Sequence, residues 1–297
     1  MKELNYILKN IAVAKIIGDS ATTVDGIAID SREVKSNYLF AAVNGTQVNG
    51  HDFIDQAIDQ GATAVLCENL PKNIRKGITY ISCIDSAFAL GHMASAFYDH
   101  PTKDLKVIAI TGTNGKTSVA TVLKNAFTQL GYTVGLISTV KNLVGEKEIP
   151  ATHTTPHAVA IQSLFSQMAE ESCDYVFMEA SSHAIHQKRI SGIDFDGAIF
   201  TNISHDHLDY HQTFSNYIKA KKELFDGLPS KAFALTNIDD NNGRVMLQNT
   251  KAKKRTYSLR SLADYKTKVL EQDFTSMLLE INGSEVYTPL SGTFNAY

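Results

Sequence analysis

Short apolar runs alternate with stretches of helical period along most of this 297-residue chain. In the first hundred residues, apolar and β-branched runs predict strands, and apolar positions three or four residues apart predict helices. The predicted strands are 26–30, 38–43, 64–67 and 79–81, and the predicted helices are 52–60 and 86–98. Pro101 then disfavours continuation of a helix, so a domain boundary is expected at 100–102.

Beyond this boundary the alternation of strands and helices becomes regular. The predicted strands are 106–111, 133–137, 175–178, 197–201 and 232–235, and the predicted helices are 117–130, 158–172 and 213–228. Such alternation indicates an α/β fold with a mostly parallel sheet flanked by helices, and ligands of such sheets gather at the carboxyl ends of the strands. We therefore predict two domains, an N-terminal α/β domain at 1–101 and a central domain at 102–297.

The strand 106–111 runs directly into a glycine-rich loop that is followed by a lysine and a hydroxyl residue. Backbone amides and a helix N-terminus bind phosphate oxygens, a lysine reaches the terminal phosphates, and the hydroxyl binds Mg²⁺. The residues expected to bind a nucleotide are Gly112, Thr113, Asn114, Gly115, Lys116, Thr117 and Ser118. The usual pattern has a glycine where Ile110 stands, so an ordinary glycine-rich turn is the alternative.

Polar residues also follow two other predicted strands, and they should lie near this loop. Glu179 comes after the apolar run 175–178 and is well placed to bind a Mg²⁺ ion that accompanies a nucleotide. The alternative is an acid at the N-terminus of the next helix. Alternating His and Asp residues at 204–211 follow the strand 197–201 and indicate either a polar site or a solvated turn.

A lysine falls within the apolar face of the predicted helix 213–228. At 3.6 residues per turn, Lys221 lies near the middle of the face formed by Tyr217, Ile218, Ala220, Leu224 and Phe225. Its amine either extends to water or is desolvated, with a lowered pKa that makes it reactive. Reaction with CO₂ would convert it to a carbamate, which is an oxygen ligand for a metal.

Composition narrows the class of protein. A hydrophobic content of 43%, a charged content of 20% and a net charge of −3 are typical of a soluble globular protein and give no electrostatic reason to expect nucleic acid. The chain has no signal-peptide pattern and no run of 18 apolar residues, so we expect no membrane insertion. Three scattered cysteines fit free thiols in the cytoplasm, where we expect the protein to be.

Together these segments resemble the Mur ligases, which add amino acids to the peptidoglycan precursor during cell wall synthesis. The loop TGTNGKTS is this family's variant of the phosphate loop, which accounts for Ile110. The similarity is closest to the MurE type of the family. It is carried by DSR at 30–32, TTP at 154–156, EASSHAIHQKR at 179–189, TNISHDHLDYH at 201–211 and AKKELF at 220–225.

The resemblance implies binding sites for UDP-MurNAc-L-Ala-D-Glu, ATP and Mg²⁺. The implied uridine contacts are Ser31, Thr46, Gln47 and Val48. The implied contacts to the rest of that substrate are Thr154, Thr155, Ser181, Gln187 and Arg189. ATP and Mg²⁺ would be served by Lys116, Thr117, Glu179 and His207, with Lys221 carbamylated as a further metal ligand and Asn237 near the base.

The activity implied by the resemblance is an ADP-forming peptide-bond synthesis. ATP would phosphorylate the free D-Glu carboxylate, and the amine of a third amino acid, meso-diaminopimelate or L-lysine, would attack the acyl phosphate. Lys116, Lys221 and His207 would be the catalytic residues. In the family, a segment like 291–297 leads into a third, carboxyl-terminal domain, so we expect a monomeric two-domain fragment that binds substrate without turnover.

Three other readings stay open. Folylpolyglutamate synthases share the phosphate loop and the lysine helix, although their loop lies near the N-terminus. A P-loop kinase or switch would need neither Ser181, Gln187 and Arg189 nor a lysine on an apolar helix face. A non-catalytic module that binds a nucleotide or a UDP-sugar is the third.

Overall fold

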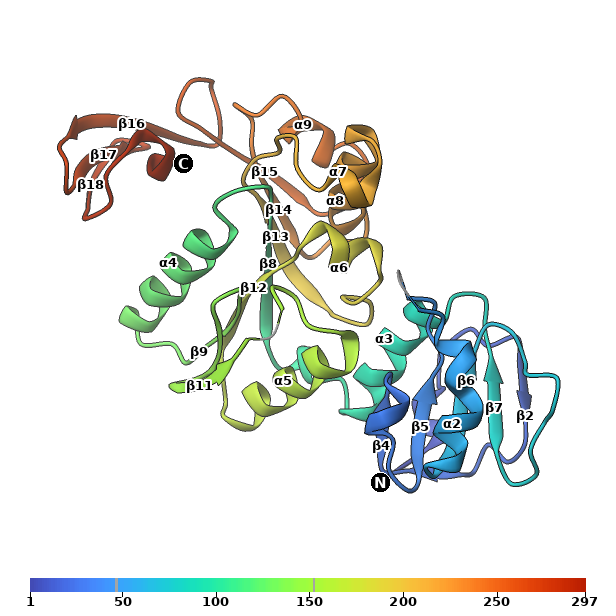
Figure 1. Ribbon diagram of the computed structural model, residues 1–297. Helices are drawn as coiled ribbons and strands as arrows, with labels where there is room; N and C mark the ends of the chain where they lie inside the picture. Colours follow the sequence, from blue (N-terminus) through green and yellow to red (C-terminus); the bar gives the residue numbers. More distant parts are fainter. Residues whose placement is uncertain (46–47, 152) are drawn as a thin grey trace. The chain divides into compact units, whose positions relative to one another are not determined.

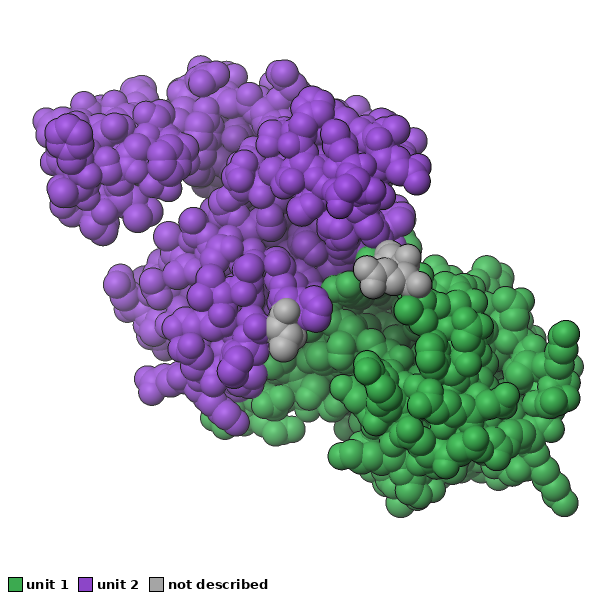
Figure 2. Space-filling view, viewed as in Figure 1, with its two compact units in different colours: residues 1–105, 156–172, 187–194 green, residues 106–155, 173–186, 195–297 purple. Residues whose placement is uncertain are grey.

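The chain forms two compact units in a computed structural model that describes residues 1–45, 48–151 and 153–297 (Figure 1). Unit 1 consists of 1–105, 156–172 and 187–194, and unit 2 consists of 106–155, 173–186 and 195–297 (Figure 2). The units therefore differ from the two contiguous domains expected at 1–101 and 102–297. Three stretches of the expected central domain, 102–105, 156–172 and 187–194, belong to unit 1.

Unit 1 is built on a five-stranded sheet with helices on both faces. Its order is β2 (Lys15–Ile17), β7 (Thr79–Ser82), β6 (Ala62–Cys67), β5 (Tyr38–Ala41) and β4 (Gly26–Ala28). All neighbours pair in parallel except β2 with β7. The other elements of the amino-terminal hundred residues are β1 (Lys2–Glu3), α1 (Leu4–Ile7), β3 (Thr23–Val24), η1 (Ser31–Glu33), η2 (Gly50–Phe53), α2 (Ile54–Asp59) and α3 (Ser86–Phe97).

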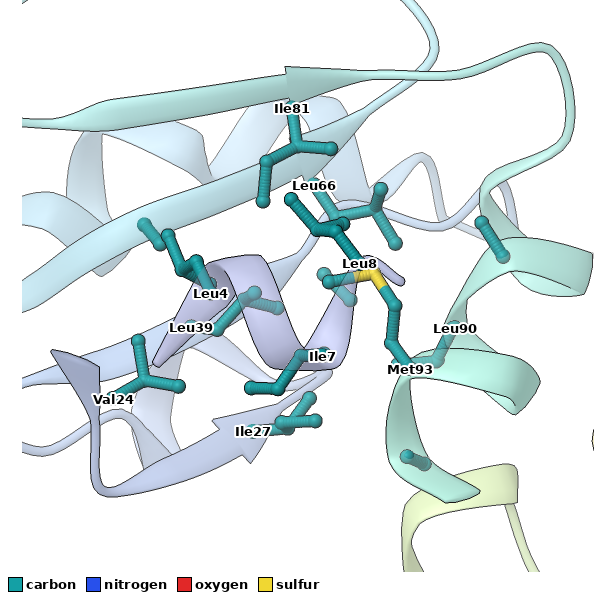
Figure 3. Packing of buried hydrophobic residues seen from close by; sticks show 14 of the residues in the cluster. Leu4, Ile7, Leu8, Val24, Ile27, Leu39, Leu66, Ile81, Leu90 and Met93 are labelled. Atoms are coloured by element: carbon teal, nitrogen blue, oxygen red, sulfur yellow. The ribbon is translucent and has the colours of Figure 1, made fainter. Parts of the chain in front are cut away.

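Alternate residues of these strands enter two different apolar cores. Leu39, Leu66 and Ile81 pack with α1 and with Met93 of α3 (Figure 3). The residues next to them along the strands, such as Phe40 and Val65, pack in the second core with α2. Because successive strand residues point to opposite faces, a sheet covered on both sides has strands that are apolar throughout.

The two later segments of unit 1 pack against α3. Helix α5 (Ala158–Glu170) contributes Ala158 to the core that contains Met93. In the segment 187–194, the backbone passes so close to α3 that a Cβ on Gly91 would lie 2.5 Å from the Ser191 carbonyl oxygen. Close packing of this kind, and not position in the sequence, assigns both segments to unit 1.

Unit 2 contains an eleven-stranded sheet with a parallel centre. The parallel strands run in the order β9 (Val134–Ile137), β12 (Tyr175–Glu179), β8 (Lys106–Thr111), β13 (Phe195–Phe200), β14 (Phe233–Asn237), β15 (Lys253–Ser258) and β16 (Tyr265–Gln272). Antiparallel strands extend both edges, namely β10 (Lys141–Val144) and β11 (Lys147–Pro150) beyond β9, and β17 (Met277–Ile281) and β18 (Ser284–Thr288) beyond β16. The predicted α/β class is confirmed, whereas the β10–β11 hairpin was not predicted.

Helices cover both faces of the central strands (Figure 1). Helix α4 (Lys116–Gln129) packs through Phe127 on one face, beside Phe177 and Ile199. On the other face, Phe200 packs against Phe225 of α8 (Phe214–Asp226). The shorter helices of unit 2 are α6 (Ser182–His186), α7 (Leu208–His211) and α9 (Gly243–Met246), and the chain ends in η4 (Thr293–Ala296).

Parallel pairing brings the carboxyl ends of β9, β12, β8, β13 and β14 to one edge of the sheet. The polar residues that follow these strands therefore lie side by side, although they are far apart in the sequence. Over the described parts of the chain, no helix combines the length and apolar character needed to cross a membrane.

We predict that Gly91→Ala destabilises unit 1. Alanine in a helix interior usually stabilises a protein by about 1 kcal/mol relative to glycine. Here the added methyl group meets the Ser191 carbonyl oxygen at 2.5 Å, and overpacking typically costs about 1–3 kcal/mol. Urea unfolding followed by circular dichroism should show a lower midpoint for the variant. A midpoint raised by the better helix former would show that 187–194 does not pack on α3.

Candidate nucleotide and substrate site

The glycine-rich loop lies between β8 and α4, at the carboxyl edge of the sheet. A Cβ on Gly112 would lie 1.9 Å from Thr201 Oγ1, and Gly115 has a φ of +86°. The loop is held by Asn202, whose carbonyl oxygen accepts from the Thr113 amide at 2.8 Å and whose Oδ1 accepts from the Asn114 amide at 3.0 Å. The first amides of α4 have no partner within the helix and point to where a phosphate would sit.

Two predicted catalytic lysines meet at one carbonyl oxygen of this loop. Lys116 Nζ donates to the Gly112 oxygen at 3.0 Å and to the Thr113 oxygen at 2.9 Å. Lys221 Nζ donates to the same Gly112 oxygen at 2.8 Å. Lys221 is therefore joined to Gly112 of the phosphate loop, 109 residues earlier in the chain.

Burial decides between the two readings of Lys221. Its side chain is only 1% exposed, so it does not extend to water. Burial lowers the pKa of Lys221 well below its usual value, and the nearby charge of Lys116 lowers it further. Burial also lowers the pKa of Lys116, against the opposing effect of Glu179. The neutral form of the Lys221 amine is therefore favoured more than it is for a lysine in water.

Tyr217 connects the lysine helix to the phosphate loop, and the sequence assigned it only to the apolar face. Lys221 Nζ lies 4.6 Å from the centre of its ring, a distance typical of a cation–π contact. Its hydroxyl lies 3.1 Å from Thr113 Oγ1. The signal in the sequence is a tyrosine one helical turn before the lysine, since a buried tyrosine hydroxyl needs a polar partner.

Glu179 is fully buried at the end of β12, and its carboxylate accepts three hydrogen bonds. Oε1 accepts from Thr117 Oγ1 at 2.8 Å and from the Thr139 amide at 2.8 Å. Oε2 accepts from Thr139 Oγ1 at 3.2 Å. Within the described ranges Glu179 has no ion pair, so these donors, together with the charge of nearby Lys116, offset its desolvation.

Three of the predicted substrate residues gather around the same glutamate. Thr155 Oγ1 donates to the Glu179 carbonyl oxygen at 2.8 Å and accepts from the Ser181 amide at 3.1 Å. Thr154 Oγ1 lies 3.1 Å from Thr139 Oγ1. Thr139 was missed by the sequence reasoning. The available signal was a Ser-Thr pair directly after the predicted strand 133–137, the same pattern that identified Glu179.

The remaining predicted substrate residues lie in unit 1, apart from two that fall outside the described residues. Ser31 is buried and donates to Gln56 Oε1 at 2.9 Å. Arg189 donates to Gln187 Oε1. Val48 is 54% exposed, whereas Thr46 and Gln47 are the two that lie outside the described residues. The uridine and peptide contacts of these residues stay predictions.

The run 204–211 makes several ring contacts, although residues 204–209 are exposed. His207 packs against His183, with ring centres 4.8 Å apart, and its Nε2 lies 3.5 Å from Asp206 Oδ2. His211 is buried, and its Nε2 lies 3.0 Å from Ser182 Oγ. Burial, followed by the neighbouring histidines, lowers the pKa of His211 to about 4.

The four predicted metal ligands fall into two pairs. Thr117 and Glu179 are hydrogen-bonded to each other, while His207 and Lys221 both contact the Tyr217 ring. No group of three or more His, Cys, Asp or Glu side chains suited to a metal occurs in the part of the chain that is described. The hydroxyl and carboxylate oxygens of Thr117 and Glu179 fit a Mg²⁺ ion that takes its other ligands from phosphate and water.

Asn237 ends β14 with both ends of its side-chain amide engaged within the protein. Nδ2 donates to the Thr201 carbonyl oxygen at 3.0 Å, and Oδ1 accepts from the Asp239 amide at 3.0 Å. The first of these bonds ties β14 to the residue that follows β13, beside the loop. Each end of the amide keeps one further donor or acceptor position, and the predicted contact to a nucleotide base stays a prediction.

Comparison with known families favours one of the readings left open by the sequence. A model described as the Mur ligase middle domain matches residues 110–297, and one described as the Mur ligase family catalytic domain matches 23–98. The chain belongs to the Mur ligase family. The resemblance drawn from the sequence motifs is thus confirmed at the level of the family.

The relatives with high identity share one name. The chain is 53% identical over 294 residues to the UDP-N-acetylmuramoyl-L-alanyl-D-glutamate–2,6-diaminopimelate ligase of Phocaeicola vulgatus, covering 99% of this chain and 61% of the relative. It is 47% identical over 298 residues to the ligase of that name from Cytophaga hutchinsonii, covering 100% and 61%. The chain therefore spans about 61% of the length of these relatives.

Solved structures agree with the fold. A ligase with the same name superposes with a TM-score of 0.80 at 26% identity, covering 99% of this chain and 61% of the other. The MurF ligase of Thermotoga maritima in complex with ADP superposes with a TM-score of 0.58 at 21% identity, covering 91% and 58%, which supports the shared fold alone.

We predict that His211 makes the protein less stable in mild acid. Its pKa is about 4 in the folded protein against 6.5 as its usual value, so between these values the unfolded chain binds more protons and stability falls as the pH falls. The loss by pH 5 should be roughly 2 kcal/mol.

The free energy of unfolding, measured in urea at pH 7 and pH 5, checks this. His211→Gln should lose less stability between the two pH values than the parent chain does. His205→Gln, which changes an exposed histidine of the same run, serves as the control and should behave like the parent. Equal losses in the parent and His211→Gln would contradict the prediction.

Proposed function

We propose that the chain carries the ATP site and the UDP-substrate site of a ligase that extends UDP-MurNAc-L-Ala-D-Glu by a third amino acid, with formation of ADP. One observation carries the proposal. The buried Glu179 carboxylate is shared by Thr117 of the phosphate loop and, through Thr139, by Thr154 of the predicted substrate cluster. The names of the relatives favour diaminopimelate over lysine as the incoming amino acid.

The chemistry requires two anions to approach each other. The D-Glu carboxylate must come close to the γ-phosphate of ATP, so catalysis depends on charge neutralisation and positioning. The Lys116 ammonium donates to the Gly112 and Thr113 carbonyl oxygens, and it can exchange them for phosphate oxygens. The free amides of the first turn of α4 would bind the same phosphates.

Thr117 and Glu179 are proposed as the residues that hold Mg²⁺. The ion would offset phosphate charge during transfer. The Thr117 hydroxyl now donates to Glu179 Oε1, so a cation between the two oxygens would replace that hydrogen bond. In the proposed arrangement Thr154, Thr155 and Ser181 orient the substrate next to the same carboxylate.

Lys221 is proposed to be carbamylated. Because its pKa is lowered by burial, its nitrogen is available to attack the carbon of CO₂. A C–N bond forms, one proton leaves the nitrogen, and a neutral amine becomes an anionic carbamate. The nearby Lys116 ammonium would balance this charge. The carbamate and His207 would then supply ligands for a second metal ion.

The carbamate can be detected without enzyme turnover. We expect the chain, incubated with ¹³C-bicarbonate at pH 8, to give a carbamate carbon resonance that disappears in Lys221→Gln. Lys219→Gln, which changes an exposed lysine on the same helix, should keep the resonance. A resonance that survives in Lys221→Gln would assign the modification to another amine, and its absence from the parent chain would contradict the proposal.

Substrate binding is tested by calorimetry. We expect the chain to bind UDP-MurNAc-L-Ala-D-Glu, and Arg189→Ala to weaken binding by about 10- to 100-fold, which corresponds to the loss of one charge-assisted hydrogen bond. Arg255→Ala, which changes an exposed residue of β15, should leave affinity unchanged.

Binding of Mg·ADP provides the second control, because Arg189→Ala should not alter it. A chain that binds Mg·ADP but not the UDP-linked dipeptide would be a nucleotide-binding module of another kind. Binding of a folate in place of the dipeptide would favour a folylpolyglutamate synthase-like ligase.

A further inference from the structure

Thr139 joins two groups of residues that the proposed function treats as separate. It follows β9, and the pairing of β9 with β12 brings it to Glu179, 40 residues further along the chain. Its amide donates to Glu179 Oε1, and its hydroxyl lies 3.2 Å from Glu179 Oε2 and 3.1 Å from Thr154 Oγ1. The hydroxyl is therefore placed between a predicted metal ligand and a predicted substrate contact.

Counting protons shows that this hydroxyl has two alternative arrangements. A threonine hydroxyl carries one hydrogen, and an ionised carboxylate only accepts. Thr139 Oγ1 is the donor toward both Thr154 Oγ1 and Glu179 Oε2, and its one hydrogen can serve only one of them at a time. In the first arrangement Thr139 donates to Glu179 Oε2. In the second, Thr139 donates to Thr154, and Oε2 loses this donor. The amide bond from Thr139 to Oε1 is the same in both.

An anionic group of a substrate would select the second arrangement. If the Thr154 hydroxyl donates to an anionic group of the substrate, its oxygen becomes a stronger acceptor for the Thr139 proton, because hydrogen bonds in a chain polarise one another. The Thr139 proton then turns away from Glu179, and Oε2 gains a free lone pair for a cation. In the absence of the substrate, the same lone pair is occupied by the Thr139 proton.

We propose that Thr139 is a positioning residue that couples the two ligands, so that the UDP-linked substrate and the magnesium nucleotide bind with positive cooperativity. This inference rests on the proposed function, because it takes Thr154 as a substrate contact and Glu179 as a metal ligand. By linkage, each ligand must raise the affinity of the other by the same factor.

The test is a set of calorimetric titrations on the chain itself. Mg·ADP is titrated with and without saturating UDP-MurNAc-L-Ala-D-Glu, and the substrate is titrated with and without saturating Mg·ADP. We expect each ligand to tighten the other by about tenfold, which lies within the usual range of coupling between sites. Mg²⁺ should be required, since ADP with EDTA should show no coupling.

Two variants separate the relay from general packing. Thr139→Val keeps the shape and the backbone amide but removes the hydroxyl, and it should reduce the coupling to less than about twofold. Thr139→Ser keeps the hydroxyl and should retain the coupling. Thr154→Val breaks the relay from its other end and should also abolish coupling. It serves as the second test if Thr139→Val does not fold.

The outcomes distinguish the relay from the proposed function. Binding of both ligands without coupling in the parent chain overturns the relay and leaves the proposed function standing. Full coupling in Thr139→Val also overturns the relay, as does loss of coupling in a folded Thr139→Ser. Failure of the parent chain to bind the UDP-linked substrate overturns both.

Discussion

The site in unit 2 depends on the burial of one carboxylate. Glu179 is fully enclosed, and a buried charge is tolerated only when its oxygens find donors. Those donors come from the loop after β8 and from Thr139 after β9, the two strands that flank β12. The register of three parallel strands must therefore be correct before the carboxylate can be satisfied, which links the fold of the sheet to the chemistry at its edge.

A second feature of the site is the positive charge at the Gly112 carbonyl oxygen of the phosphate loop. Lys116 and Lys221 both donate to it, and burial disfavours the charged form of both. Two ammonium groups at one oxygen repel each other, so the arrangement favours an incoming anion or the loss of a proton. A bound polyphosphate would be such an anion, and carbamylation of Lys221 would involve the loss of a proton.

The family motifs cross the boundary between the two units. Thr155 belongs to unit 2 and Pro156 to unit 1, while Ser181 belongs to unit 2 and Gln187 to unit 1. Residues that are neighbours in one motif therefore belong to different units. The cause is local packing, because α5 and the segment 187–194 bury their surfaces against α3.

The sequence alone determined the α/β class and the position of the phosphate loop, since each follows from local periodicity or from a short motif. It placed Lys221 on an apolar helix face, and only the structure decided that the side chain is buried. The strand 106–111 was predicted with the bounds it has in the structure. The sequence did not predict Thr139, Tyr217 or the discontinuous units. Their roles arise from contacts between residues 40 or more positions apart or from packing between helices. Only the tertiary structure decides such contacts, because strand order and close packing bring together residues that no local pattern relates.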